Sequence, residues 1–502
     1  MTLKRQPSVR LIQSISLLLL AVTGAGCYTS GSPTVSAKQC FELSGNDFSE
    51  ALACYNKAEA ARPLNYVSHG QTSEPGLTIS RFELTSQSWA PDASVAPQDW
   101  KHEVSIYRPV DALAGPALLV INDGINHAAP DNAAQPPDDF TEPTLKNIAL
   151  KTRTVVVSVS NVPNQYLTYS DDHVPRQEDD SVAHSWALFL KAPQDRPFIA
   201  LQVPMTIAVI KTMDLVQKET AQDPIKTFTL TGASKRGWST WLVAILDPRV
   251  TGIVPFVIDI LNADKVFDHT YAVYANNWPL AFIDYYRQGV IAQRKSRAFE
   301  QLMQVQDPMR YLHSAYADRL SIPKYIVNAS GDDFFLPDNT REYYAELRAE
   351  KALRVLPNTP HDVTPFIEDT LIPYLNRQHS KRAMPTITVQ ESERGKNSKI
   401  LSLHLSEVPV KVTHWTAINR AARDFRYNCG IRYTPTALVA SQNVQVTFKA
   451  PSTGWSAQFV ETHYADGFVT TTDVQVLPDT YPVNAPPSDG KLCQTLPGAP
   501  GN

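Results

Sequence analysis

The sequence predicts an α/β fold with a largely parallel sheet, followed by a smaller all-β region. Short, continuous apolar runs of the kind that form buried parallel strands recur from Ala117 onward. Segments with helical spacing of apolar residues separate the later runs, and this alternation is typical of a parallel sheet covered by helices. From about Ala383 the helical spacing ends and short strands with turn signals follow, which indicates a β-sandwich at 383–481.

Length and charge bound the class of protein. The chain has 502 residues, and 43% of them are hydrophobic, which is enough for more than one domain with a large core. The formal net charge is −4 and the basic residues form no long run. The sequence therefore gives no indication of nucleic-acid binding.

The first 26 residues have the pattern of an export signal. Basic residues at positions 4, 5 and 10 precede an apolar run at 17–22, and small residues lead to Cys27. This ending resembles a bacterial lipobox, in which the cysteine is lipidated and attaches the protein to a membrane. A lipobox normally has leucine where Gly24 stands, so plain cleavage near 25–26 is the alternative. We expect an exported protein that is periplasmic, an outer-membrane lipoprotein or secreted, and its oligomeric state stays open.

Cysteine usage agrees with export. With Cys27 set aside, four cysteines remain, and sequence proximity favours the pairs Cys40–Cys54 and Cys429–Cys493 among three possible pairings. No spacing of ligand residues resembles a zinc site, and we expect neither a metal nor a cofactor.

The elements before the β region follow in order. A tether at 28–37 and a helix at 49–61 make up a segment at 27–76 that precedes the α/β domain at 77–380. Strands are predicted at 77–84, 102–107, 117–121, 152–159, 227–230, 252–258, 324–329 and 352–356. Apolar and polar residues alternate in the first two, which suits a half-exposed antiparallel edge. The later ones are continuous apolar runs, which suit buried parallel strands. Helical spacing predicts helices at 182–189, 203–217 and 343–351.

An aromatic-rich insertion at about 260–320 is too long for a plain loop. We expect a helical lid over the site, and the alternative is an extra packed helical layer. The β region is expected to have strands at 386–390, 400–405, 408–413, 444–448 and 458–462. The Pro/Gly-rich tail at 482–502 is expected to lie irregularly on the surface, tied down by Cys493.

Ser234 stands at the turn between the strand 227–230 and a helix, which is the architecture of a nucleophile elbow. Such a sharp turn needs small neighbours. Gly232 supplies one at the usual place, whereas the position two after the serine is Arg236 and the second glycine is displaced to Gly237. The alternative is an ordinary turn in which the serine caps the helix.

The partners of Ser234 decide between these interpretations. Asp332 and Asp333 follow the strand 324–329, and His361 follows the strand 352–356. Serine, acid and histidine in that order along the chain are typical of α/β-hydrolases. We favour Asp332 as the acid, with Asp333 as the alternative, and expect Asp338 to be a turn or capping residue.

Acyl transfer also needs donors for the developing oxyanion. We expect the backbone N–H of Lys235, the residue after the serine, and a second donor from the loop that contains Gly124 and Ile125. Lys235 and Arg236 place positive charge at a helix start, where the helix dipole does not favour it. This suggests an anionic transition state or substrate, and the alternative is two solvated side chains.

With these residues in place, the sequence resembles the PhoPQ-activated pathogenicity-related protein family of the PqaA type. The motifs that carry the resemblance occur in the family's order over nearly the whole mature chain: PNQ at 163–165, EDDSVAHSW at 178–186, TGASKRGWSTW at 231–241, DPRV at 247–250, NASGDDFFLPD at 328–338, LPNTPH at 356–361, RDFR at 423–426 and PSTGW at 451–455. The resemblance implies an α/β-hydrolase core with a C-terminal β domain, in exported bacterial proteins linked to virulence or to antimicrobial-peptide resistance. The elbow is also similar to that of glucuronoyl esterases, where the basic residue after the serine helps to hold the oxyanion; by position this is Lys235.

Two functions of different classes follow. The first is an exported serine hydrolase that cleaves a small-molecule ester or a peptide bond, with Ser234 as nucleophile, His361 as general base and Asp332 orienting the imidazole. The second is a non-catalytic secreted or surface-attached binding or signalling protein on the same fold. Replacing Ser234 by alanine abolishes the biological effect in the first case and leaves it intact in the second.

Overall fold

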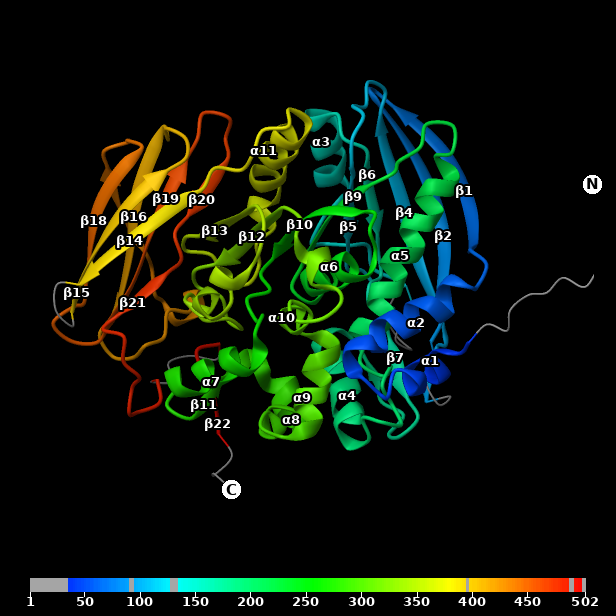
Figure 1. The fold of residues 1–502 in the computed structure, drawn as a ribbon, viewed down its shortest axis with the longest axis horizontal. Helices are drawn as coiled ribbons and strands as arrows, with labels where there is room; N and C mark the ends of the chain where they lie inside the picture. Colours follow the sequence, from blue (N-terminus) through cyan, green and yellow to red (C-terminus); the bar gives the residue numbers. More distant parts are fainter. Residues whose placement is uncertain (1–34, 90–93, 127–133, 394–396, 487–491, 499–502) are drawn as a thin grey trace, which may run out of the picture. The chain divides into compact units, whose positions relative to one another are not determined.

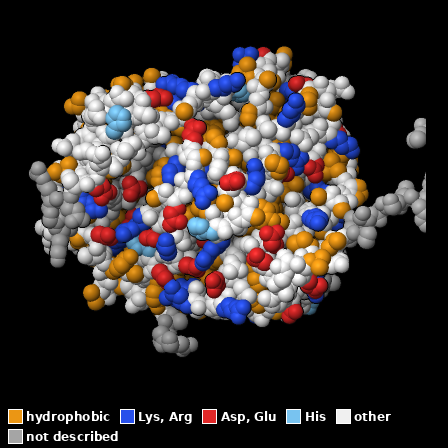
Figure 2. Space-filling model, in the orientation of Figure 1, with side chains coloured by type: hydrophobic (Ala, Val, Ile, Leu, Met, Phe, Trp, Pro, Cys, Tyr) orange, Lys and Arg blue, Asp and Glu red, His pale blue; other side chains and the backbone are white. Residues whose placement is uncertain are grey.

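The computed structural model describes residues 35–89, 94–126, 134–393, 397–486 and 492–498 (Figure 1). Within it, Ser36–Asn502 form one compact unit. The predicted signal peptide, Cys27 and most of the tether lie outside the described residues, so lipidation and export stay predictions. None of the helices in the described ranges combines the length and apolar character that a membrane span requires. On the face drawn in Figure 2, acidic and basic side chains are interspersed rather than gathered by sign.

A nine-stranded sheet forms the centre of this unit, in the order β1-β2-β4-β6-β5-β9-β10-β12-β13. The strands from β6 to β13 run parallel, whereas β1, β2 and β4 pair antiparallel at one edge. The bounds are Asn65–Glu74 (β1), Leu77–Ser88 (β2), Asp99–Pro109 (β4), Ala117–Ile121 (β5), Val156–Val159 (β6), Phe228–Ala233 (β9), Val250–Phe256 (β10), Lys324–Ala329 (β12) and Lys351–Leu356 (β13). The predicted parallel sheet with an antiparallel edge is confirmed; β1 was not predicted.

Two hydrophobic cores cover the two faces of this sheet. Within β5, Leu119 and Ile121 belong to one core and Leu118 and Val120 to the other, because successive side chains of a strand point to opposite faces. The first core contains α4 (Glu178–Lys191), α5 (Gln202–Glu219) and α6 (Lys235–Leu246), and the second contains α3 (Glu142–Thr152) and α11 (Ile367–His379). All residues of β5 are buried, which explains their unbroken apolar sequence.

The helix predicted at 343–351 is wrong. The chain there forms two short 3₁₀ turns, Asn339–Glu342 and Tyr344–Glu346, and then enters β13. Tyr343 is buried and donates its hydroxyl to Asp259 at 2.6 Å, and the Lys351 ammonium donates to the carbonyls of Tyr344 and Leu347. These contacts fix the backbone against its helical preference.

The insertion after β10 is helical and packs onto the first core. It contains α7 (Ala263–Val273), β11 (Asn277–Pro279), η3 (Leu280–Phe282), α8 (Ile283–Arg287), η4 (Ile291–Gln293), α9 (Arg297–Gln306), α10 (Pro308–Tyr311) and η5 (Ala317–Leu320). Trp278, Phe282 and Phe299 are buried in it. Most of its aromatic residues therefore serve packing, as the second interpretation expected, although three of them also border the site described below.

The C-terminal region is a sandwich of two antiparallel sheets. One sheet contains β14 (Ile387–Glu393), β15 (Ser398–Leu405) and β18 (Asn443–Lys449); the other contains β16 (Lys411–Asn419), β17 (Thr434–Leu438), β19 (Trp455–His463), β20 (Val469–Thr471) and β21 (Gln475–Leu477). Leu401 and Val446 of the first sheet share a core with Val460 of the second. In Figure 1 these strands lie beside β12 and β13, and Val355 donates its N–H to Thr471 Oγ1 at 3.1 Å.

Two disulfides close the pairs favoured by the sequence. Cys40–Cys54 joins α1 (Ala37–Leu43) to α2 (Ala51–Ala60), and Cys429–Cys493 joins the sandwich region to the tail. The tail is less irregular than expected, because β22 (Thr495–Pro497) pairs with β11 of the insertion. Disulfides persist in oxidising compartments, which agrees with the predicted export.

Candidate active site

Ser234 occupies the turn between β9 and α6 with φ 56° and ψ −127°. A positive φ is strained for a residue with a side chain, and it is held here by the surrounding structure. Both neighbouring glycines are required: a Cβ on Gly232 would lie 2.9 Å from the carbonyl oxygen of Arg236, and one on Gly237 would lie 2.9 Å from that of Phe256. The displaced glycine thus still serves the crossing of strand and helix. The Ser234 side chain makes no capping hydrogen bond, so the capping interpretation finds no support.

The acid and the histidine meet beyond the ends of β12 and β13. His361 Nδ1 lies 2.9 and 3.0 Å from the two carboxylate oxygens of Asp332. Asp332 Oδ1 also accepts the backbone N–H groups of Phe334 and Phe335, at 2.8 and 3.2 Å. The carboxylate is therefore fixed from one side and holds the imidazole from the other.

The two other aspartates near this strand end have different partners. Asp333 Oδ2 accepts a hydrogen bond from Asn428 Nδ2 at 2.8 Å. Asp338 is buried, pairs with Arg423 at 2.6 Å and lies 3.3 Å from His269 Nε2. Of these three aspartates, Asp332 is the one that holds His361, as the favoured choice between Asp332 and Asp333 expected.

His361 offers one free ring nitrogen. Its Nε2 is buried and has no hydrogen-bond partner among the described residues. Burial by itself lowers the pKa of this imidazole, but the charge and the hydrogen bond of Asp332 outweigh burial and raise the pKa above its usual value. Nε2 is thus the atom that can exchange a proton with a ligand or a hydroxyl.

Ser234 and His361 line one cavity of about 770 Å³, a volume measured as the space open to the centre of a water molecule. No hydrogen bond joins the Ser234 hydroxyl to His361 Nε2. Such bonds are often long in ligand-free enzymes and tighten when substrate binds. The two side chains therefore share the space in which a reacting atom would lie.

The expected oxyanion donors differ in availability. Lys235 is the first residue of α6, and a helix leaves its first N–H groups without internal partners. The N–H of Ile125 is already used, since it donates to the carbonyl of Gln135 at 2.9 Å. Gly124 lines the cavity with φ +110°, and a Cβ there would lie 2.7 Å from Asn161 Oδ1, so the backbone approaches its surroundings closely.

Lys235 and Arg236 are buried rather than solvated. The Lys235 ammonium lies 2.8 Å from Glu178 and 3.2 Å from Asp179, and Arg236 donates to Glu178 and, at 2.7 Å, to the carbonyl of Val162. Burial raises the pKa of the Glu178 carboxyl, but the two cations outweigh burial and hold the pKa well below its usual range. The interpretation as solvated side chains is wrong, and the sequence held no signal for this pairing.

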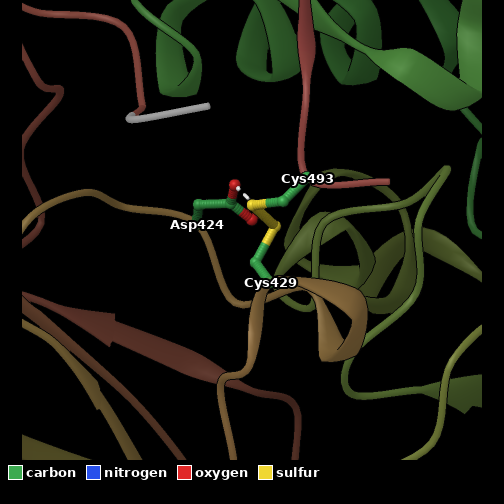
Figure 3. A group of neighbouring side chains, drawn as sticks. All are labelled: Asp424, Cys429 and Cys493. Carbon is green, nitrogen blue, oxygen red and sulfur yellow. Dashed lines mark hydrogen bonds between the residues drawn. A yellow bond between two sulfur atoms is a disulfide. The ribbon is translucent and has the colours of Figure 1, made fainter. Parts of the chain in front are cut away.

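Acidic side chains dominate the rest of the cavity. Its described lining contains two cations, Lys235 and Arg236, and six carboxylates: Asp123, Asp138, Asp139, Glu178, Asp179 and Asp362. Burial and a hydrogen bond with Asp138 raise the pKa of Asp123 to about 6. Asp123, Asp138 and Asp139 bring carboxylate oxygens within 4.8 Å of one another, as a cation site would. A second such group, Asp424 with Cys429 and Cys493, has both sulfurs in the disulfide (Figure 3).

A second, smaller cavity opens beside Ser234. Its volume, measured in the same way, is about 40 Å³. Aromatic and aliphatic side chains form most of its wall, among them Trp186, Trp238, Ile258, Phe282, Tyr285 and Phe334. The rings of Trp186 and Trp238 meet edge to face with centroids 5.6 Å apart. The insertion contributes three of the lining rings, Phe267, Phe282 and Tyr285.

Comparisons with known proteins identify the family of this chain. The family model described as PhoPQ-activated pathogenicity-related protein matches residues 52–426. The chain belongs to this family. A relative, autocrine proliferation repressor protein A of Dictyostelium discoideum, is 32% identical over 435 residues, which cover 80% of this chain and 85% of the relative. The family match includes Ser234, Asp332 and His361 and ends at Arg426, before most strands of the sandwich.

Solved structures show more distant similarity. Acetyl xylan esterase 1 from Thermoanaerobacterium sp. JW/SL YS485 is 13% identical with a TM-score of 0.44, over 66% of this chain and 93% of the esterase. A glucuronoyl esterase from Solibacter usitatus is 16% identical with a TM-score of 0.41, over 70% of this chain and 95% of the esterase. The α/β-hydrolase fold of this chain is established by its own sheet order, with the serine after β9, the acid after β12 and the histidine after β13.

Proposed function

We propose that this family member is a serine hydrolase that cleaves carboxylic esters. The observation that carries the proposal is the arrangement of His361. Asp332 holds its Nδ1, its Nε2 has no partner among the described residues, and the residue lines the same cavity as the strained Ser234. A nucleophile, a base and a group that orients the base are the parts that acyl transfer requires.

In the proposed reaction, Ser234 Oγ attacks the ester carbonyl while His361 Nε2 takes the hydroxyl proton. The bond between the carbonyl carbon and the alcohol oxygen then breaks, and His361 gives the proton to the departing alcohol. Water repeats the sequence on the acyl-serine, releasing the acid and restoring Ser234. Asp332 stabilises the imidazolium that forms, and the Lys235 N–H is the first candidate donor to the oxyanion.

Esters suit the site better than peptides. The acyl half of a peptide bond carries an amino acid and the chain before it, whereas the apolar cavity beside Ser234 measures about 40 Å³. The family resemblance also implies export and a link to virulence or to antimicrobial-peptide resistance, and these belong to the proposal.

The test is labelling with a fluorophosphonate probe, which reacts with activated serines. We expect labelling of the wild type, and loss of labelling in Ser234→Ala and His361→Ala. Ser239→Ala is the matched control, because Ser239 lies in the same helix, donates its hydroxyl to the carbonyl of Lys235 and does not border the cavities. A wild type that is folded but not labelled contradicts the proposal and favours a binding or signalling role.

A further inference from the structure

Two cavities of opposite character meet at Ser234. The small one is largely aromatic and the large one is polar, and both are bordered by Ser234, Lys235, Asp179 and Phe334. An ester bound at Ser234 has two halves, the acyl group and the alcohol. Each cavity can therefore take one half, and the position of His361 decides which.

His361 borders the large cavity and is not part of the wall of the small one. In the proposed reaction the histidine must reach the oxygen of the departing alcohol to protonate it. The alcohol consequently lies in the large cavity, on the side of His361. The acyl group is left with the small aromatic cavity.

The small cavity offers few polar partners. The Tyr285 hydroxyl donates to Asp179 at 3.0 Å, Trp186 Nε1 donates to Gln202 Oε1 at 3.0 Å, and Trp238 Nε1 donates to the carbonyl of Gln306 at 2.7 Å. The polar atoms of these rings are thus used within the protein. Gln202 also lines this cavity, and its buried Nε2 has no partner among the described residues. Apart from this amide, an acyl group in this space meets mostly ring and alkyl surface, which favours an apolar chain.

The volume limits the length of that chain. The space open to the centre of a water molecule is about 40 Å³ in the small cavity and about 770 Å³ in the large one, so the small cavity suits a short chain. Phe282 and Trp186 are buried and lie in a continuous ring network, with Trp186 and Tyr285 centroids 5.4 Å apart and Phe282 and Tyr285 centroids 6.3 Å apart. The wall is therefore packed and does not yield readily to a longer chain.

The large cavity selects by charge. Lys235 and Arg236 are already paired with Glu178, and the remaining described carboxylates leave the cavity acidic. A carboxylate or phosphate on the alcohol would meet like charge there. The expectation of an anionic substrate, which rested on the two basic residues alone, is not supported by this charge balance.

We infer that the substrate is an ester of a short apolar acid with a polar alcohol that carries no negative charge. This inference rests on the proposed function and adds the substrate class. It assigns Phe282 as a specificity-determining residue for the acyl chain.

The test compares 4-nitrophenyl acetate, butyrate, hexanoate and octanoate on the full exported chain, with acylation of Ser234 followed by intact-mass spectrometry as well as turnover. We expect kcat/KM to fall about tenfold or more at the first chain that exceeds the cavity. Phe282→Leu is expected to raise the hexanoate-to-acetate ratio of kcat/KM at least tenfold. The ratio does not depend on the fraction of folded enzyme.

Phe189→Leu is the matched control, because Phe189 is buried in the first core and packs on Phe48 with centroids 5.6 Å apart, and neither ring borders the cavity. Its ratio is expected to equal that of the wild type. Fluorophosphonate labelling of Ser234 with equal reaction of all chain lengths overturns the substrate class and leaves the hydrolase intact. Absence of labelling overturns both.

The charge of the alcohol is tested with 3-acetoxybenzoate and 3-acetoxybenzamide, which differ little in size. We expect kcat/KM for the carboxylate to be about tenfold lower, and the difference to shrink with added salt, because salt screens like-charge repulsion. A carboxylate ester that reacts as fast as the amide, or faster, contradicts the acidic-cleft part of the inference.

Discussion

Asp332 and Asp333 are neighbours with different partners, and this difference predicts the effect of replacing each. Asp332 holds His361 Nδ1 at 2.9 Å, whereas Asp333 is held by Asn428. We expect Asp332→Asn to lower kcat about 10³-fold or more, because the amide no longer stabilises the imidazolium or fixes its tautomer. Asp333→Asn is the matched control and should change kcat less than tenfold. Steady-state kinetics with 4-nitrophenyl acetate distinguish the two, and the opposite order would make Asp333 the acid.

The raised pKa of His361 predicts the pH dependence of the reaction. A general base must be neutral, so kcat/KM should fall about tenfold for each pH unit below the His361 pKa, with a midpoint above the usual value of about 6.5. Burial alone would place this midpoint lower, and the Asp332 charge places it higher. In the residual activity of Asp332→Asn the midpoint should therefore move to lower pH. An unchanged midpoint would mean that another group controls the profile.

The sequence predicted some residues of the site and could not predict others. Ser234, Asp332 and His361 follow buried strands, and parallel strands bring such positions to one edge of the sheet. Glu178 opens α4, and no local pattern shows that it meets Lys235, 57 residues away in sequence. The same holds for Asn428 and Asp333, which are 95 residues apart. Contacts of this kind depend on the packing of distant elements.

At the scale of elements, a segment of the C-terminal region supports the loops that carry the acid and the histidine. Tyr427 donates its N–H to the carbonyl of Gly331 at 2.9 Å, and Asn358 exchanges hydrogen bonds with the backbone of Tyr433 at 2.6 and 2.9 Å. Cys429 lies between these contacts and is bound to Cys493 of the tail (Figure 3). The disulfide therefore fixes a segment that contacts both loops.

This arrangement separates the effects of the two disulfides. Replacing Cys429 and Cys493 by serine should lower kcat/KM severalfold under conditions where the protein stays folded, because the support of the Asp332 loop is loosened. Replacing Cys40 and Cys54, which join α1 to α2, should lower stability by about 2–4 kcal/mol and leave kcat/KM unchanged. Kinetics and denaturant unfolding of both variants provide the check. Equal kinetics in the two variants would contradict a role for the segment.

Element prediction was accurate for some fully buried strands and failed for an exposed one. The fully buried β9 was predicted at 227–230 but extends three residues further. The strands at 117–121 and 324–329 agree with β5 and β12 at both ends, since every residue in them is buried and apolar runs define them. Strand β1 is mostly exposed and polar, so no alternation marked it. Helix α11 contains Pro373 in its interior, a residue that argues against a helix in sequence although the packing here accommodates it.

At the scale of the whole compact unit, the α/β core, the insertion and the sandwich region meet at one carboxylate. Asp338 follows β12, its Oδ2 lies 2.6 Å from Arg423 of the sandwich region, and its Oδ1 lies 3.3 Å from His269 of α7. The side chains of all three residues are at most 2% exposed. Domain boundaries predicted from composition, at 380 and 383, thus separate regions that share a buried ion pair.

This carboxylate gives the last prediction. Burial raises the pKa of Asp338, but Arg423 and His269 outweigh burial and hold it well below its usual range. A depressed pKa contributes stability that is present above the unfolded pKa of about 4 and is lost as the pH falls through the folded value. Asp338→Asn should therefore cost about 3–5 kcal/mol of unfolding free energy at neutral pH, because Arg423 stays buried without its counter-charge.

The matched control is Asp479→Asn, since Asp479 pairs with Arg341 at 3.0 Å but its side chain is 54% exposed. Surface pairs contribute about 0–1 kcal/mol, so this variant should unfold almost as the wild type does. Urea unfolding at pH 7 and at pH 3 measures both. The difference in unfolding free energy between Asp338→Asn and the wild type should be smaller at pH 3, because the wild type begins to lose the contribution of this carboxylate there. A small difference in unfolding free energy at pH 7 would show that the three regions hold together without this carboxylate. Other contacts, such as those between β13 and β20, would then supply most of the stability of the interface.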